Sequence, residues 1–337
     1  MWGMEFYQLL SFVRQLGLAL AGGASLWAMV FLYLAHKRKL EDSGGIFLDW
    51  IGLRLRWLVG LGSLLAVLGW LSLMMIVPSF AHEGVTLVTE KMDVLTAMGA
   101  TSPLYVILLI VAILIVRHRK NPAKLYNEKK GTSWLYITSF VTASLAISYY
   151  TDLTSLPLKE VIFHMFHGFH SIFTLGTVLT LDFIFLSTQK APFVQKHIFP
   201  FFSKISKVIW IGLSLDLLST LLIYPEAVAT TPRFFFAQSV LGILVINGIL
   251  LSGVITRRML HNIHIGHKEA SKKWELFATI AGAISITSWA SITFVDFFHG
   301  LDVKLWQLFS IYIAIIICAV IGHSIWNILD TRAERMR

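Results

Sequence analysis

Cysteine is almost absent from this sequence of 337 residues: the only one is Cys318, in an apolar stretch near the C-terminus. One cysteine cannot form an intramolecular disulfide, a C-x-x-C redox pair or a thiolate zinc cluster. Any metal ion bound within the chain would therefore need histidine, methionine or carboxylate ligands.

Charged residues are also scarce, at 14% of the chain, whereas 56% of the residues are hydrophobic. A water-soluble core of ordinary composition cannot hold that much apolar surface, so we expect an integral membrane protein with the lipid bilayer as its solvent. The net charge of +9 then concerns membrane orientation, and no nucleic-acid partner is expected. No nucleotide-binding loop and no Ser/His/Asp arrangement is present, which argues against soluble-enzyme chemistry, although whether the chain is an enzyme stays open.

Long apolar runs indicate the fold class. About 20 apolar residues are needed to cross the roughly 30 Å of hydrocarbon in a bilayer. Runs of this kind occur near 7–35, 57–79, 97–116, 132–151, 161–187, 207–225, 234–256, 275–298 and 305–329. We therefore predict an all-α, polytopic transmembrane bundle of about nine spans, with no loop long enough for a soluble domain.

Basic residues gather in alternate connections. After the first, third, fifth and seventh runs they include Lys37, Arg38, Lys39, Arg54 and Arg56, then Arg117, Arg119 and Lys120, then Lys190 and Lys196, then Arg257 and Arg258. The positive-inside rule makes these connections cytoplasmic, so the N-terminus lies outside and the C-terminus inside. The cationic cluster follows the first run instead of preceding it, so we do not expect a cleaved signal peptide. A bacterial cytoplasmic (inner) membrane is the predicted location.

The order of spans suggests an internal repeat. Gly23 aligns with Gly176 in the first and fifth spans, and Pro78 aligns with Pro225 at the ends of the second and sixth. Each repeat would contain four spans, an even number, so both copies would insert in the same orientation as a parallel repeat. The predicted divisions are 1–156 and 157–300 for the two four-span repeats, followed by 301–337 for the ninth span and cytoplasmic tail.

Histidines mark the start of the fifth span, which reads HMFHGFH. His164, His167 and His170 fan over one helix face, and Asp296 and His299 end the eighth span at the same outer depth. Imidazole is a common ligand for haem iron and transition metals, and a carboxylate can orient it. The pattern predicts either axial histidines for a haem b, from the fifth and eighth spans, or a copper or zinc site. The alternative is that the histidines contact headgroups and water at the interface.

Other polar residues lie deeper in the predicted spans. Asp182, Asp216, Asn247 and His323 would form a discontinuous line across the membrane, as a proton or cation path requires. Asn and Asp can instead join helices by hydrogen bonds without further function. A proton-coupled or cation transporter is therefore an alternative to the cofactor protein, and a structural subunit of a membrane complex is a third interpretation.

Residues 160–298 resemble a superfamily that includes the copper-resistance D membrane proteins and the haem-dependent membrane protoporphyrinogen oxidase. The resemblance rests on HGFHSIFTLGTVLTLDF, on LSTLLIYP and on RFFFAQSVLGILVINGILL. It implies a four-helix unit that holds haem or handles copper, with His164, His167 or His170 matching the family histidine, and redox partners or other membrane subunits as its contacts. The oxidase subgroup has a lysine where this chain has Gln238, which argues against that oxidase activity.

Overall fold

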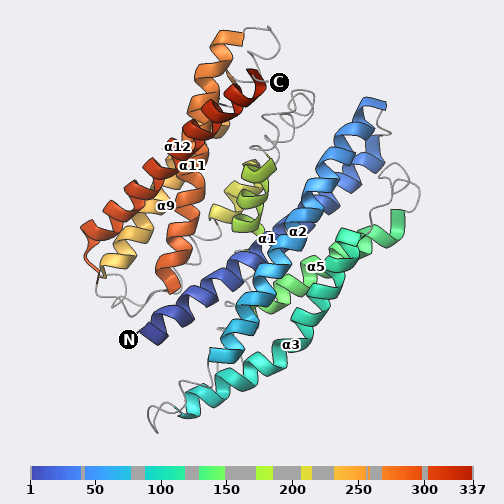
Figure 1. Ribbon diagram of the computed structural model, residues 1–337, viewed down its shortest axis with the longest axis vertical. Coiled ribbons are helices and arrows are strands. Elements are labelled where there is room, and N and C mark those ends of the chain that lie inside the picture. Colours follow the sequence, from blue (N-terminus) through green and yellow to red (C-terminus); the bar gives the residue numbers. More distant parts are fainter. Residues whose placement is uncertain are drawn as a thin grey trace. The chain divides into compact units, whose positions relative to one another are not determined.

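Helices make up nearly all of the described structure. The computed structural model describes residues 2–38, 42–76, 88–117, 129–148, 172–184, 206–214, 231–255, 257–258, 268–297 and 303–335 (Figure 1). No β-strand occurs in these ranges. The predicted all-α class is therefore confirmed for this part of the chain.

The helices belong to two compact units. The first covers residues 1–197 and 208–220, and the second covers 198–207 and 221–337. The principal helices of the first unit are α1 (Trp2–Arg38), α2 (Asp42–Ile76), α3 (Val88–Arg117), α5 (Lys129–Ser148) and a helix over 172–184. The second contains α9 (Pro232–Leu250), a π-helical turn η3 (Leu251–Ile255), α11 (Lys268–Phe297) and α12 (Leu305–Arg335).

Several helices are long and apolar enough to cross a bilayer. In the described residues these segments are Leu9–Tyr33, Trp50–Met75, Gly99–Arg117, Pro232–Ile255 and Leu305–Gly322. Shorter apolar helices cover Ser133–Ile147, Ile172–Ile184 and Leu276–Ile292. All eight fall largely within runs that the sequence predicts as spans. The chain is thus an integral membrane protein by the length and composition of its helices.

One helix extends beyond its predicted span. The sequence predicts a second span from 57, with Arg54 and Arg56 in the preceding connection. In the structure α2 begins at Asp42 and its apolar segment at Trp50, so both arginines lie within the helix. Both have aromatic partners: Arg54 stacks on Trp50, and Arg56 donates a hydrogen bond to the hydroxyl of Tyr136.

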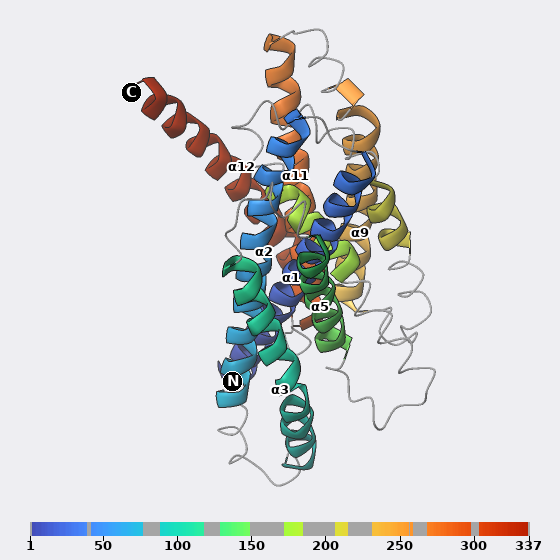
Figure 2. The ribbon, with the colours of Figure 1, turned by 90° about the vertical axis from the view of Figure 1, so that its right-hand side faces the viewer.

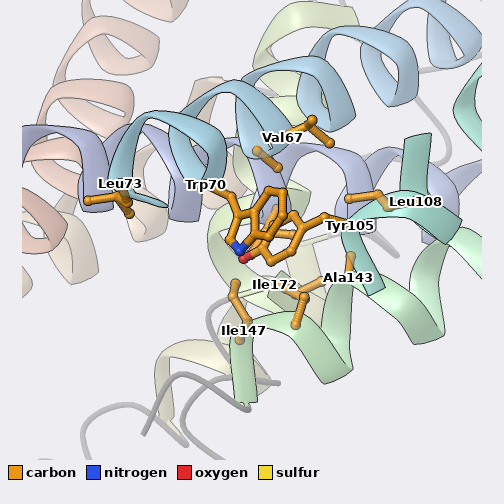
Figure 3. Close-up of a cluster of buried hydrophobic side chains, with 11 residues drawn as sticks. Val67, Trp70, Leu73, Tyr105, Leu108, Ala143, Ile147 and Ile172 are labelled. Carbon is orange, nitrogen blue, oxygen red and sulfur yellow. The ribbon is translucent and has the colours of Figure 1, made fainter. Parts of the chain in front are cut away.

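The first unit contains a ring of four helices, in which α1 contacts α2 and α5, and α3 contacts the same two helices. Figure 2 shows these helices from a second direction. In their core Trp70 of α2 stacks on Tyr105 of α3, with ring centroids 5.1 Å apart (Figure 3). Ile147 of α5 and Ile172 of the helix over 172–184 pack in the same cluster. The helix over 172–184 thus contributes to the core of this ring.

Small residues let the backbones of the first unit approach closely. A Cβ atom added to Gly17 of α1 would overlap the backbone of Ala66 in α2, and one added to Gly62 would overlap Ala21. Gly23 of α1 lies against Gly176, where a Cβ would likewise overlap the backbone. Helix association in lipid depends on such close van der Waals contact, because burial from water supplies little driving force there.

Candidate functional site

The structure describes only some of the predicted site residues. His164, His167, His170, Asp216 and His299 lie outside the described residues. The remaining four predicted positions are in described helices. Asp296 is in α11 and His323 is in α12, but the structure does not describe their side chains; Asp182 and Asn247 are described in full.

Asn247 joins two helices of the second unit. It is buried in α9, and its Nδ2 donates a hydrogen bond to the backbone carbonyl of Ala281 in α11 at 2.8 Å. The carbonyl of a helix residue normally accepts only from its own helix, so this bond uses its second lone pair. The contact is the interhelical bond expected of a structural asparagine.

Asp182 lies near the end of the helix over 172–184. Its Oδ2 is buried and has no hydrogen-bond donor among the described residues. A buried carboxylate oxygen without a donor is costly, because the charge loses its hydration without compensation. Bound water, a proton or a cation at this oxygen would remove that cost.

Threonines form a buried face on the same helix. Thr174, Thr177 and Thr180 are fully buried, at the spacing that brings side chains to one side of a helix. Trp27 of α1 donates from Nε1 to Oγ1 of Thr177 at 3.1 Å. The threonine spacing is visible in the sequence, but it was not among the predicted sites, since hydroxyl residues are common in membrane helices.

A second polar contact holds α1 on another side. Ser25 of α1 donates from Oγ to Oγ of Ser139 in α5 at 2.9 Å, and both residues are fully buried. Because Ser25 and Trp27 are two residues apart, they point to nearly opposite sides of α1. The helix is therefore bonded on one side to α5 and on the other to the helix over 172–184.

Arg14 is a buried cation in the apolar segment of α1. Only 2% of its surface is exposed, and Ser11, one turn earlier, is buried as well. A Cβ placed on Gly69 of α2 would lie 2.9 Å from Cβ of Arg14, so the glycine makes room for the arginine stem. The face of α1 with Ser11, Arg14 and Gly17 therefore looks into the helix ring and not into lipid.

No group of three or more histidine, cysteine or acidic side chains gathers in the part of the chain that the structure describes. Comparison with models of known families, with curated proteins and with solved structures finds no match for this chain. The resemblance stated from the sequence, and the predicted ligand set, therefore remain predictions.

Proposed function

We propose that the second half of this protein binds a haem b or a copper ion near the outer face of the membrane and serves electron transfer or metal handling. The ligands would come from His164, His167 and His170, with His299 and Asp296 opposite them. The proposal includes nine spans, an outside N-terminus, a cytoplasmic C-terminus and a parallel repeat, in a bacterial cytoplasmic membrane.

The observation that carries this proposal is the burial of one face of α1. With Gly23 aligned to Gly176, the three histidines correspond to Ser11, Arg14 and Gly17. All three of these are buried within the helix ring. If the second half repeats this packing, its histidines face the inside of a four-helix bundle, where haem and metal sites are found in such bundles.

Two contacts in the described residues support the repeat. The aligned glycines Gly23 and Gly176 contact each other, as equivalent residues do on a twofold axis. In addition, Gly62 packs on Ala21, and Gly212 packs on Thr174, the residue that aligns with Ala21. These two equivalent contacts align Gly62 with Gly212. The resulting alignment of the second and sixth spans is close to the one that pairs Pro78 with Pro225.

The same register places a carboxylate beside a predicted histidine ligand. In this register Ala66 aligns with Asp216, and Gly17 aligns with His170. The contact of Gly17 with Ala66 in the first repeat would therefore correspond to His170 facing Asp216 in the second. Asp216 would then accept a hydrogen bond from one ring nitrogen of His170 and leave the other for the ligand.

The donor set suits a group held by imidazole. Histidine nitrogens bind haem iron and copper, and an outer-shell carboxylate fixes the ring orientation. The chemistry that such a group would supply is one-electron transfer, while the chain would hold it, orient it and keep lipid and water away from it.

The test is a reduced-minus-oxidised optical spectrum of detergent-purified protein, with metal analysis of the same sample. A Soret band, or stoichiometric copper, is expected from the native chain. His170→Ala and His299→Ala should each remove the group while the protein still inserts in the membrane. His261→Ala provides a control, because this histidine lies in a predicted cytoplasmic connection. A signal retained in both ligand variants would overturn the proposed pair.

One observation favours a second function, proton-coupled or cation transport. Oδ2 of Asp182 is buried without a donor among the described residues, as expected of a carboxylate that takes up a proton or cation. On this alternative the purified protein holds no cofactor, and Asp182→Asn or Asp216→Asn abolishes pH-dependent flux in liposomes. Unchanged flux in both variants would remove these carboxylates from the path. A structural subunit, the third interpretation, predicts neither signal.

A further inference from the structure

An apolar stripe runs along one face of α2. Leu61, Leu64, Leu68 and Leu71 are all between 44% and 50% exposed and recur at the spacing of a single helix face. Leucines on such a face of a membrane-spanning helix contact acyl chains. The stripe begins with Trp57, whose side chain is 58% exposed.

Arg54 lies one turn before Trp57, on the same face. Its guanidinium carbon lies 3.5 Å from the centroid of the Trp50 ring, and its Nη1 donates to the carbonyl of Trp50 at 3.2 Å. A guanidinium has five N–H donors in a rigid plane. Stacking and one hydrogen bond therefore hold the guanidinium plane in place, and its other N–H groups remain available as donors.

The surroundings of Arg54 belong to one end of the helix ring. Arg56 of α2 bonds to Tyr136 of α5, and a Cβ on Gly60 would lie 2.9 Å from Cγ2 of Val116, near the end of α3. Trp134 at the start of the α5 apolar helix is 65% exposed. This end also carries basic positions in the sequence, namely Lys37 and Arg38 in α1, Arg117 in α3, and Lys129 and Lys130 in α5. We call it the basic end of the ring.

We propose that the face of α2 at the basic end is a binding site for one anionic phospholipid. The headgroup phosphate accepts hydrogen bonds from Arg54, the indole of Trp57 lies at the level of the glycerol, and an acyl chain follows the leucine stripe. Charge complementarity commits the site to an anionic lipid. A phosphate accepts the forked donors of arginine, and a lipid whose phosphate is not neutralised by a cationic headgroup is also attracted to the basic end.

The leucine stripe distinguishes this ligand from free phosphate. A phosphate ion would contact Arg54 alone and would gain nothing from an apolar surface two or more turns away. A phospholipid gains contacts at both ends, since indole rings favour the membrane interface and the leucines favour its hydrocarbon. The site is independent of the histidine-rich region and requires only that α2 spans the membrane.

The experiment measures lipid binding to the full chain, purified and delipidated in neutral detergent, by native mass spectrometry. Phosphatidylglycerol is the probe and phosphatidylcholine the neutral reference. Phosphatidylglycerol should bind more tightly, and Arg54→Gln should weaken its binding about tenfold, as for the loss of a charge-assisted hydrogen bond. The loss for phosphatidylcholine should be smaller, because its choline already offsets the phosphate charge. Arg54→Lys should give an intermediate loss, because lysine keeps the charge without the fork.

Arg117→Gln is the matched control, since it removes the same charge from an exposed side chain at the basic end. It should change binding by less than about twofold, as expected for a screened surface charge. Equal losses in Arg117→Gln and Arg54→Gln would overturn the site in favour of diffuse attraction. Competition by millimolar inorganic phosphate would overturn the lipid assignment. Trp57→Ala, at an exposed position, should also weaken phosphatidylglycerol binding; unchanged affinity in this variant and in Arg54→Gln would refute the proposal.

Discussion

A side chain at Gly23 would have to occupy space that the backbone of Gly176 already fills. We therefore expect Gly23→Ala to destabilise the protein by about 2 kcal/mol or more, since overpacking forces backbone shifts. This outcome opposes the ordinary effect of the change, because alanine favours a helix over glycine by about 1 kcal/mol. Thermal unfolding in detergent, followed by circular dichroism, measures the difference.

Gly52 of α2 provides the comparison, because a Cβ there would meet nothing within 4 Å. Gly52→Ala should leave the midpoint unchanged or raise it. A Gly23→Ala variant as stable as Gly52→Ala would show that the α1 contact with Gly176 is not a close one.

Asn247 shows what sequence reasoning reaches at the scale of one residue. The apolar run around it predicts that it lies within the membrane, and the cost of burying an amide predicts that it has a partner. The identity of that partner, the carbonyl of Ala281, depends on which helices are neighbours and on their rotation. Neither is specified by a run of apolar residues. For Asp182 the sequence likewise predicts a position in a span but not the residues around its carboxylate.

At the scale of elements, apolar runs located the helices well and their ends less well. The helix α2 begins before the predicted span, because basic residues mark the edge of the hydrocarbon and not the end of a helix. Arginine can continue a helix there when its stem lies along the helix and its head finds an aromatic or polar partner. Trp50, the partner of Arg54, lies one turn earlier in the same helix, at a spacing that the sequence already contains. Tyr136, the partner of Arg56, could be recognised only once α2 and α5 were seen together.

The helix over 172–184 is attached to α1 by a bond that can be measured. Trp27→Phe and Thr177→Val each remove one partner of the Nε1 to Oγ1 hydrogen bond. A double-mutant cycle in mixed detergent micelles should give a coupling free energy of about 0.6 kcal/mol, the average for such bonds in membranes. Equilibrium unfolding with increasing sodium dodecyl sulfate provides the four free energies.

A second cycle tests the specificity of that coupling. Trp27→Phe combined with Ser139→Ala should be additive, because the hydroxyl of Ser139 bonds to Ser25 instead. Similar coupling in both cycles would mean that the substitutions act through a general loosening of α1 and not through the bond to Thr177.

At the scale of the whole molecule, the sequence predicts more than a list of helices, because alternating charge gives each connection a side of the membrane. The internal repeat stays a prediction from the alignment of Gly23 with Gly176, whereas the contact between these two glycines is a finding that only a structure could add. Its physical basis is that two helices can cross this closely only where both lack side chains. A match of glycines in an alignment does not by itself show that they touch.

An odd number of spans places the two ends of the chain on opposite sides of the membrane, and this property separates nine spans from eight or ten. The basic tail with Arg332, Arg335 and Arg337 favours the cytoplasm for the C-terminus. A green fluorescent protein fused to the C-terminus of the bacterially expressed chain should therefore fluoresce, and alkaline phosphatase fused there should be inactive.

For the N-terminus, a single cysteine introduced at Met4 in a Cys318→Ala background should react with a membrane-impermeant maleimide in intact spheroplasts. Labelling of Met4→Cys only after lysis, together with a fluorescent C-terminal fusion, would place both ends inside and would require an even number of spans. Two four-span repeats could then keep a common orientation only if the ninth span were absent or were followed by a tenth.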